Sequence, residues 1–167
     1  SIIFWGPPGV GKTTLASIIA REAGARFISI LAVMSGKEEL KKALAEAANT
    51  LAATGEKSIL FIDEIHRWNK AQQDALLPHV EKGAIILIGS TTENPSFEII
   101  GALLSRCRVF ILKYLTKDEL VKIITAALKD RERGLGEETI EMPKEVLETL
   151  AELSGGDARV ALTGLEL

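Results

Sequence analysis

The sequence contains few of the residues that build covalent or metal cross-links. Its 167 residues include one cysteine, Cys107, and two histidines, His66 and His79. One thiol cannot form an internal disulfide, which favours a reducing compartment. One cysteine with two histidines also provides no ligand set for a structural zinc ion.

Long apolar runs and an excess of positive charge are absent as well. No run of about 18 apolar residues occurs, so we expect no membrane-spanning helix, and no signal peptide is recognisable. With 20 basic against 23 acidic residues the net charge is −3, so there is no overall basic signal for nucleic acid. Lys37, Lys41 and Lys42 alternate with Glu38 and Glu39, which indicates a solvated helix face.

Five short, continuously apolar runs indicate strands. Because they do not alternate polar and apolar residues, they are typical of strands buried on both faces of a parallel sheet. They are Ile2–Trp5, Arg26–Ile30, Ser58–Ile62, Ala84–Ile88 and Arg108–Leu112. The first run stands at the start of the sequence, so we expect further residues before Ser1.

Helical patterns separate these runs and predict the fold class. They cover Gly11–Ala23, Lys37–Thr54 and Asn69–Val80, the second with Leu40, Leu44, Ala47 and Leu51 on one face. This alternation predicts an α/β fold, in which helices sandwich a five-stranded parallel sheet through right-handed crossovers.

The pattern becomes purely helical after the fifth run. A capping box of Thr116 and Glu119 opens a helix that Gly134 and Gly136 end, Pro143 begins a second helix, and Asp157 caps a third. The second helix is expected to bury Val146, Leu147, Leu150 and Leu153. We divide the chain into an α/β core at 1–114 and a small helical lid subdomain at 115–167, with further residues expected beyond Leu167.

A glycine-rich loop with a lysine follows the first strand. Residues 6–13 match the Walker A pattern G-x-x-x-x-G-K-[ST] between a strand and a helix. The glycines turn backbone N–H groups toward one point, where they form a cradle for phosphates. Lys12 would neutralise the β- and γ-phosphates of ATP and Thr13 would bind Mg²⁺. The alternative is a glycine- and proline-rich turn that joins strand and helix and binds no ligand. A lysine in the first helical turn argues against it, because the charge opposes the helix dipole unless an anion faces it. The expected nucleotide-binding residues are Gly6, Pro7, Pro8, Gly9, Val10, Gly11, Lys12, Thr13 and Thr14.

Two carboxylates end the third strand. Asp63 and Glu64 follow Ile59–Ile62 as a Walker B pattern, at the strand end where α/β sheets bind ligands. Asp63 would hold Mg²⁺ through its water shell, and Glu64 would polarise the attacking water. Beside a Walker A loop, a pair of merely solvated acids is the weaker interpretation.

The residues after this acidic pair have plainer interpretations. We expect His66 at the surface, with a contact to the site as the alternative, and Trp68 in packing or in an interface. Lys70, Gln72 and Gln73 are weak candidates to face a central channel.

Further motifs follow the Walker patterns in a fixed order, ILIGST at 86–91, SRC at 105–107 and GDAR at 156–159. Together they resemble the signature of the clamp-loader group of AAA+ P-loop ATPases. Four finer stretches are DEIHR at 63–67, NKAQQD at 69–74, LPHVE at 77–81 and TTENPSF at 91–97. They resemble the family of replication-associated recombination protein A and Werner helicase-interacting protein.

The resemblance implies roles for three further residues. Thr91 would be sensor 1, reading the γ-phosphate from the tip of the fourth strand, with Thr92 and Asn94 as alternatives. Arg106 would be an arginine finger that reaches the ATP of a neighbouring subunit, although Arg106 could also be a solvated charge beside a strand. Arg159 would be sensor 2. Its place in a first helical turn fits a facing phosphate.

The resemblance also implies the function. It implies a Mg²⁺-dependent ATPase in a DNA replication and recombination protein that acts at stalled forks, with Lys12, Glu64, Thr91 and Arg106 as catalytic residues. The implied partners are ATP or ADP, DNA, further copies of the protein and replication or single-strand-binding proteins, with no membrane. A bacterial protein would lie in the cytoplasm near the nucleoid, and a eukaryotic one in the nucleus. A Holliday-junction branch-migration motor and a clamp-loader-like binding module are the rival functions.

Overall fold

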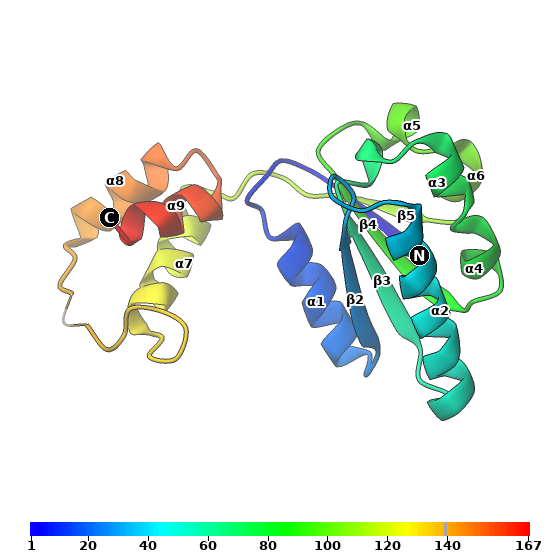
Figure 1. Ribbon diagram of the computed structural model, residues 1–167. Helices are drawn as coiled ribbons and strands as arrows, with labels where there is room; N and C mark the ends of the chain where they lie inside the picture. Colours follow the sequence, from blue (N-terminus) through cyan, green and yellow to red (C-terminus); the bar gives the residue numbers. More distant parts are fainter. Residues whose placement is uncertain (139) are drawn as a thin grey trace. The chain divides into compact units, whose positions relative to one another are not determined.

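The computed structural model describes residues 1–138 and 140–167 (Figure 1). Its internal contacts divide the chain into two compact units, which we describe one by one. The first contains residues 1–6 and 12–112, and the second contains residues 7–11 and 113–167.

The first unit is built on a five-stranded parallel sheet. Its strands are β1 (Ile2–Trp5), β2 (Arg26–Leu31), β3 (Ser58–Asp63), β4 (Ile85–Thr91) and β5 (Arg108–Ile111). They lie in the order β2-β3-β4-β1-β5, and every pair of neighbours is parallel. The α/β class and the five parallel strands are confirmed.

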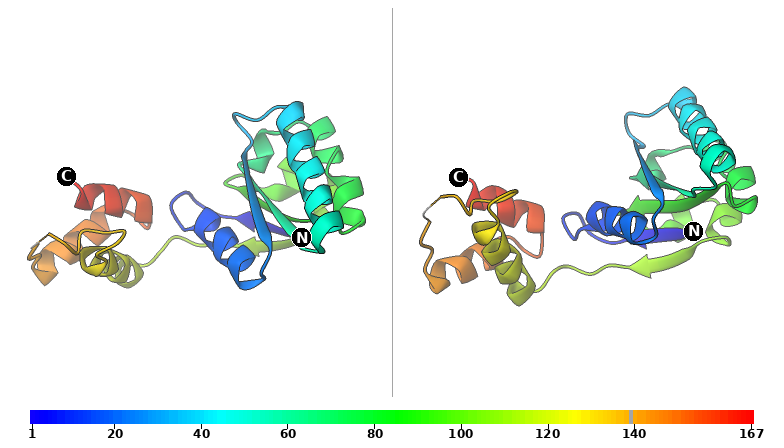
Figure 2. Two further views of the ribbon diagram at one scale, coloured as in Figure 1. Left: turned by 60° about the horizontal axis from the view of Figure 1, so that its bottom comes forward. Right: turned by 90° about the horizontal axis from the view of Figure 1, so that it is seen from below.

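Two apolar cores cover the faces of this sheet. On one face, Phe4, Phe61 and Ile88 pack with Ala16 and Ala20 of α1 (Lys12–Glu22). On the other, residues of the same strands pack with α2 (Lys37–Thr54), which lies across the strands from α1 in Figures 1 and 2. β3 and β4 are buried nearly throughout, as the sequence pattern required. The same expectation is wrong for β5, whose four residues are all exposed, and for β2, in which only Ile30 is buried, because these two strands lie at the edges of the sheet. This second core includes Ile3, Leu60, Ile62, Leu87, Leu40, Leu44 and Ala47.

One expected helix of the first unit is wrong. Instead of a helix over 69–80, the chain forms α3 (Lys70–Asp74) and α4 (Leu77–Glu81). Pro78 explains the break, because its ring lacks an N–H and would clash with the carbonyl of Asp74 in a continuous helix. Three short helical elements were not predicted: η1 (Ile65–Arg67), α5 (Pro95–Glu98) and α6 (Gly101–Leu104).

The second unit is helical, with α7 (Lys117–Lys129), α8 (Lys144–Leu153) and α9 (Ala158–Leu165). These helices bury Leu120, Ile124, Ala151 and Ala161. The expected caps form, since Thr116 and Glu119 make a reciprocal capping box and Asp157 accepts hydrogen bonds from two N–H groups of α9.

Two details of the helical unit differ from expectation. Helix α7 ends at Lys129 rather than near Gly134, because the Asp130 side chain accepts from the N–H groups of Glu132 and Arg133 and starts a turn. Val146 and Leu153 are exposed, because α8 packs through Leu147, Leu150 and Ala151 instead.

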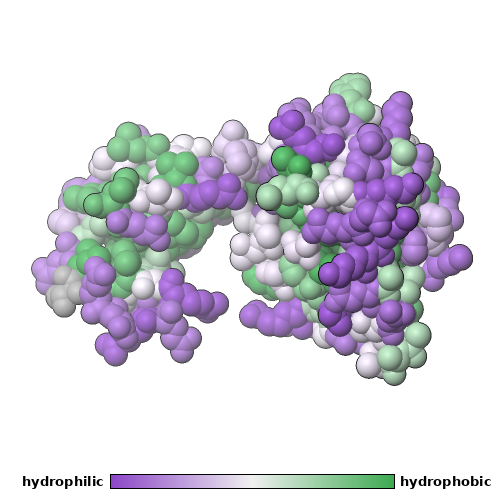
Figure 3. All heavy atoms as spheres, viewed as in Figure 1, coloured by the Kyte–Doolittle hydropathy of each residue, from purple (hydrophilic) through white to green (hydrophobic). Residues whose placement is uncertain are grey.

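Polar helix faces follow the sequence pattern. Figure 3 shows hydrophilic side chains over the outer side of α2, where Lys37, Lys41 and Lys42 and their acidic neighbours are exposed. The solvated face is therefore confirmed. Within the described residues, none of the helices has the length and apolar character needed to cross a membrane.

Candidate functional site

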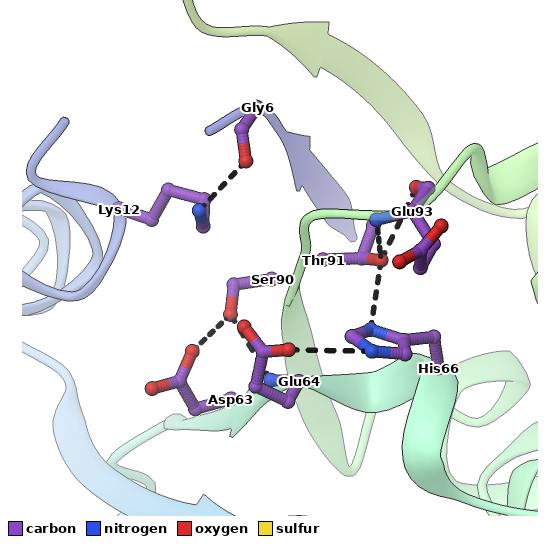
Figure 4. A network of polar contacts seen from close by, with 8 residues as sticks. All are labelled: Gly6, Lys12, Asp63, Glu64, His66, Ser90, Thr91 and Glu93. Carbon is purple, nitrogen blue, oxygen red and sulfur yellow. Dashed lines mark hydrogen bonds and ion pairs between the residues drawn. The ribbon is translucent and has the colours of Figure 1, made fainter. Parts of the chain in front are cut away.

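The candidate site in the first unit lies where β3 and β4 end. The two strands are in parallel register, with Ile62 opposite Gly89, so Asp63 and Ser90 follow side by side. The Ser90 hydroxyl donates to a carboxylate oxygen of Asp63 and accepts from the N–H of Glu64 at 3.3 Å (Figure 4). One buried hydroxyl thus positions both Walker B acids.

The backbone turns sharply at Glu64. With φ of 56° and ψ of 44°, Glu64 is the one non-glycine residue with positive φ among those described. This left-handed conformation is unfavourable for a side chain with a Cβ, and such residues cluster at functional sites. The turn leads straight into η1 and leaves the Glu64 side chain 28% exposed, open to a substrate.

The residue His66 is half-buried, but its side chain is turned inward, so the expected surface position is wrong and the alternative contact with the site is observed. Its side chain is 6% exposed and its Nε2 lies 3.3 Å from Oε2 of Glu64. Its Nδ1 lies 3.0 Å from the hydroxyl of Thr91. The short η1 helix causes the difference, because it folds position 66 back under position 64 instead of letting the chain run outward.

The Walker A lysine joins the same network. Lys12 is 8% exposed, and its Nζ donates to the carbonyl of Gly6 at 2.8 Å. The N–H of Gly6 in turn donates to the carbonyl of Thr91 at 3.1 Å. Position 6 needs glycine, because a Cβ there would lie 2.4 Å from the carbonyl oxygen of Leu112. The start of the phosphate loop is therefore fixed against the ends of β4 and β5.

Loop residues 7–11 belong by their contacts to the second unit. Gly9 and Gly11 have positive φ, 68° and 85°, which favours glycine. The N–H of Ala158, the first residue of α9, donates to the carbonyl of Gly9 at 3.0 Å. Pro7, Pro8, Gly9, Val10 and Gly11 thus share a unit with Arg159, which is exposed in the first turn of α9.

The expected metal ligands come from two elements of the first unit. Thr13 and Thr14 are exposed in the first turn of α1, and Asp63 is half-buried at the end of β3. The described residues contain no group of three or more His, Cys, Asp or Glu side chains suited to a metal. A cation here would accordingly need oxygens from a phosphate and from water besides Thr13 and Asp63.

Arg106 is exposed and is held by its own chain. Its guanidinium pairs with Glu81 at 2.6 Å and donates to the carbonyl of Ala102 at 2.7 Å. A role in a neighbouring subunit would require the exchange of this exposed ion pair for a phosphate. Next to it, burial raises the pKa of the Cys107 thiol.

The three sensor 1 candidates differ in position. Thr91 is completely buried, and its hydroxyl also contacts the N–H and the carbonyl of Glu93 at 3.0 and 3.2 Å. Asn94 caps α5 by accepting from the N–H of Ser96, and Thr92 is half-buried. Only Thr91, among these three, contacts a residue bonded to Glu64.

Gln73 is buried, so the suggestion that it faces a channel is wrong. It is 1% exposed, and its amide binds the carbonyls of Trp68 and Glu98 and the N–H of Ile100. Gln72 closes the capping box of α3. Trp68 is buried in the core, as the packing interpretation required.

Sequence reasoning missed the contributions of Ser90 and His66. A signal existed for Ser90, because a serine near the end of the apolar fourth strand becomes the neighbour of Asp63 once β3 and β4 are placed side by side. The sequence order of the strands does not reveal that pairing. His66 carried no comparable signal, since its burial depends on the left-handed turn at Glu64.

The sheet, the glycine loop with its buried lysine and the paired acids define a class of protein, the P-loop nucleoside triphosphatases. A family model described as "ATPase family associated with various cellular activities (AAA)" matches residues 2–115. The chain belongs to this AAA family, which confirms the P-loop ATPase resemblance of the motifs.

Similar proteins extend this comparison to the whole chain. Replication-associated recombination protein A of Haemophilus influenzae is 53% identical over all 167 residues, which are 37% of its own length. ATPase WRNIP1 of Dictyostelium discoideum is 50% identical over the same residues, 19% of its length. The chain therefore spans well under half of each of these relatives. The RuvB Holliday junction branch migration motor of Thermotoga maritima has a TM-score of 0.76 and 31% identity, covering 99% of this chain and 52% of that one.

Proposed function

We propose that this chain binds ATP with Mg²⁺ and hydrolyses it. The observation that carries the proposal is the continuous polar network in which Lys12, Gly6, Thr91, His66 and Glu64 follow one another (Figure 4). Lys12 and Glu64 are thereby linked at the carboxyl ends of β1, β3 and β4, which supports a shared role at one nucleotide. The Lys12 ammonium is buried and donates to the carbonyl of Gly6, and a phosphate would be a stronger, charged acceptor for such a donor.

The residues present fit a Mg²⁺ ion. Thr13 offers a hydroxyl and Asp63 a carboxylate, a small oxygen set of the kind that Mg²⁺ uses together with phosphates and water. Ser90 orients the Asp63 carboxylate by donating to one of its oxygens. When bound, Mg²⁺ would neutralise charge on the β- and γ-phosphates.

Hydrolysis would depend on Glu64 and Arg106. The exposed part of the Glu64 carboxylate would accept a proton from the attacking water. Arg106 would leave Glu81 and stabilise charge on the phosphates of a neighbouring copy, so the full-length protein would act as a homo-oligomer. Thr91 and Arg159 would sense the γ-phosphate from the core and the lid.

The biological role we propose is maintenance of DNA at stalled or recombining replication forks. The support is the 53% identity to a replication-associated recombination protein. DNA and replication or single-strand-binding proteins would be its partners. It would lie near the nucleoid in a bacterium or in the nucleus of a eukaryote.

A second candidate is a motor on branched DNA, favoured by the similarity to the RuvB branch migration motor. It would translocate DNA as it hydrolyses ATP. A clamp-loader-like module that hydrolyses slowly is the remaining alternative. It would capture a protein partner only with a non-hydrolysable ATP analogue.

The test is the steady-state ATPase rate of the full-length protein that carries this chain, with and without single-stranded and forked DNA, and with Lys12→Ala as the blank. We expect a rate that rises with DNA and disappears in Lys12→Ala. A rate equal in the parent and in Lys12→Ala would contradict ATP hydrolysis at this site. Turnover that no DNA stimulates would contradict the role at forks.

A further inference from the structure

The buried histidine of η1 stands between two groups that the proposed function uses. Its Nε2 lies 3.3 Å from Oε2 of Glu64 and its Nδ1 lies 3.0 Å from Oγ1 of Thr91. Figure 4 shows the ring between the two side chains, with one ring nitrogen toward each. Both nitrogens of His66 are thus engaged by residues of the candidate site.

The chemistry of the partners fixes the direction of one contact. A carboxylate can only accept, so a ring nitrogen beside it is favourable only when that nitrogen carries a proton. Nε2 therefore carries a proton, which points at Glu64. In the neutral imidazole, Nδ1 then has a lone pair, to which the Thr91 hydroxyl donates.

The Thr91 hydroxyl has a second acceptor. It has one proton, and the carbonyl of Glu93 lies 3.2 Å away while the N–H of Glu93 donates to it at 3.0 Å. The proton can therefore serve either His66 or Glu93, but not both. The carbonyl of the same threonine accepts from Gly6, the first residue of the phosphate loop.

Burial separates this histidine from the reaction itself. His66 is 6% exposed and Glu64 is 28% exposed, so a substrate meets the carboxylate and not the ring. A residue in this position acts by orienting its neighbour. Among the contacts described for the Glu64 carboxylate, the one to Nε2 of His66 comes from a side chain that is itself almost completely buried.

We propose that His66 is a positioning residue that holds the Glu64 carboxylate and couples it to Thr91, and through Thr91 to the start of the phosphate loop. This inference rests on the proposed ATP hydrolysis. It assigns His66 no direct contact with ATP or with the attacking water.

The experiment compares His66→Ala, His66→Gln and His66→Asn in the full-length protein. The amide nitrogen of glutamine reaches the place of Nε2, whereas asparagine reaches only that of Nδ1. We expect His66→Ala to lower kcat about tenfold or more, the loss typical of removing a group that orients a reacting one. The KM and the affinity for ATP should change less than about twofold, because the removed contact serves the transition state.

The two conservative variants separate positioning from packing. His66→Gln should recover most of kcat and His66→Asn should not, at equal Tm. His79→Ala is the matched control, since His79 is the other histidine and lies on α4, outside the network. A kcat of His66→Ala within twofold of the parent would overturn the proposal. If His66→Gln and His66→Asn lose kcat equally, and the loss matches a drop in their Tm, the proposal would be overturned as well.

A double-mutant cycle tests the coupling. Thr91→Val removes the hydroxyl at nearly constant shape. If the two residues are coupled, this substitution should lower kcat clearly less in the His66→Ala background than in the parent, because the contact between them is already lost there. Fully multiplicative losses would mean that the two residues act separately, against the proposal. If the parent hydrolyses ATP no faster than Lys12→Ala, the proposed function fails and this inference falls with it. If the parent hydrolyses ATP faster than Lys12→Ala but the His66 variants keep the parent's kcat, this inference alone is wrong.

Discussion

Most of the buried polar side chains lie in the first unit, while both units carry ion pairs at the surface. In the first, Lys12, Ser90 and Thr91 are buried and each is bonded within the protein. In the second, ion pairs lie at the surface, as where Lys117 meets Glu148 at 3.4 Å and Glu152 at 3.5 Å. Solvent screens such exposed pairs, whereas a buried polar group that loses its partner retains a full desolvation cost. Buried polar contacts are therefore concentrated in the first unit, while the second combines apolar packing and helix caps with residues 7–11 of the phosphate loop.

The largest expected effect concerns turnover. Arg106→Ala in the full-length protein should lower the ATPase rate about 10³-fold while ATP binding persists, because an arginine finger acts on transition-state charge. Rates and nucleotide affinities of parent and variant check this. Glu81→Gln is the control: it removes the partner of Arg106 but only an exposed pair, so the rate should change little. Unchanged turnover in Arg106→Ala would leave Arg106 as a surface charge.

The next effect concerns nucleotide affinity. Lys12→Ala should weaken ATP binding about 10- to 100-fold, since a hydrogen bond to a charged group contributes about 1.5–3 kcal/mol. Titration with a fluorescent ATP analogue measures this. Lys41→Ala, which removes an exposed lysine of α2 paired with Glu38, should bind as the parent does. Equal affinities of the Lys12 variant and the parent would show that the loop does not bind phosphates.

A buried amide in the first unit should matter for stability alone. Gln73→Ala should lower the free energy of unfolding by about 3 kcal/mol, because it leaves buried backbone groups of Trp68, Glu98 and Ile100 without their partner. Gln72→Ala, which removes a half-buried part of a capping box, should cost about 1 kcal/mol. Urea denaturation distinguishes them, and a cost at Gln73 no larger than at Gln72 would contradict the difference.

In the helical unit the expected effect is smaller. Asp157→Ala should cost about 1 kcal/mol, because Asp157 accepts from the N–H groups of Arg159 and Val160 at the start of α9. Asp157→Asn keeps an acceptor and should lose less. Thermal unfolding of the three proteins checks the order. Equal losses in the Asn and Ala variants would show that charge, not the capping acceptor, matters at this position.

The smallest effect is a pH dependence in the capping box of α7. Hydrogen bonds from the N–H and the hydroxyl of Thr116 lower the pKa of Glu119. A carboxylate with a lowered folded pKa contributes stability above its unfolded pKa, and this contribution is lost as pH falls through the folded pKa. The Tm difference between the parent and Glu119→Gln should therefore shrink between pH 7 and pH 3. A difference that grows on acidification would reverse the assigned sign.

The contrast between the units also explains what the sequence could predict. Apolar continuity identified all five strands, and for β3 and β4 it reflects burial on both faces, whereas the apolar residues of β5 are exposed. It cut β4 short at Ile88, since Gly89, Ser90 and Thr91 are not apolar although Ser90 and Thr91 are fully buried. The Walker motifs located the candidate site because backbone geometry restricts the residues there.

Features that depend on distant contacts were not predictable. The order of the strands, and with it the Ser90–Asp63 contact, follows from packing between segments far apart in the chain. The burial of His66 follows from a single unusual backbone conformation at Glu64. In the helical unit, α8 packs through Leu147 and Leu150 as expected, but Ala151 completes its inner face while Val146 and Leu153 are exposed, because only the neighbouring helices decide which apolar residues are covered.

The central claim is that Glu64 acts on water at an ATP site built by the Walker loop. The most direct measurement compares ATP binding and ATP hydrolysis in the full-length parent and in Glu64→Gln, under the same conditions. We predict that both proteins bind ATP with affinities within about twofold and that the variant hydrolyses it at least about 100-fold more slowly, since a general base contributes about 10²–10⁴ in rate. Hydrolysis by Glu64→Gln as fast as in the parent would contradict the account.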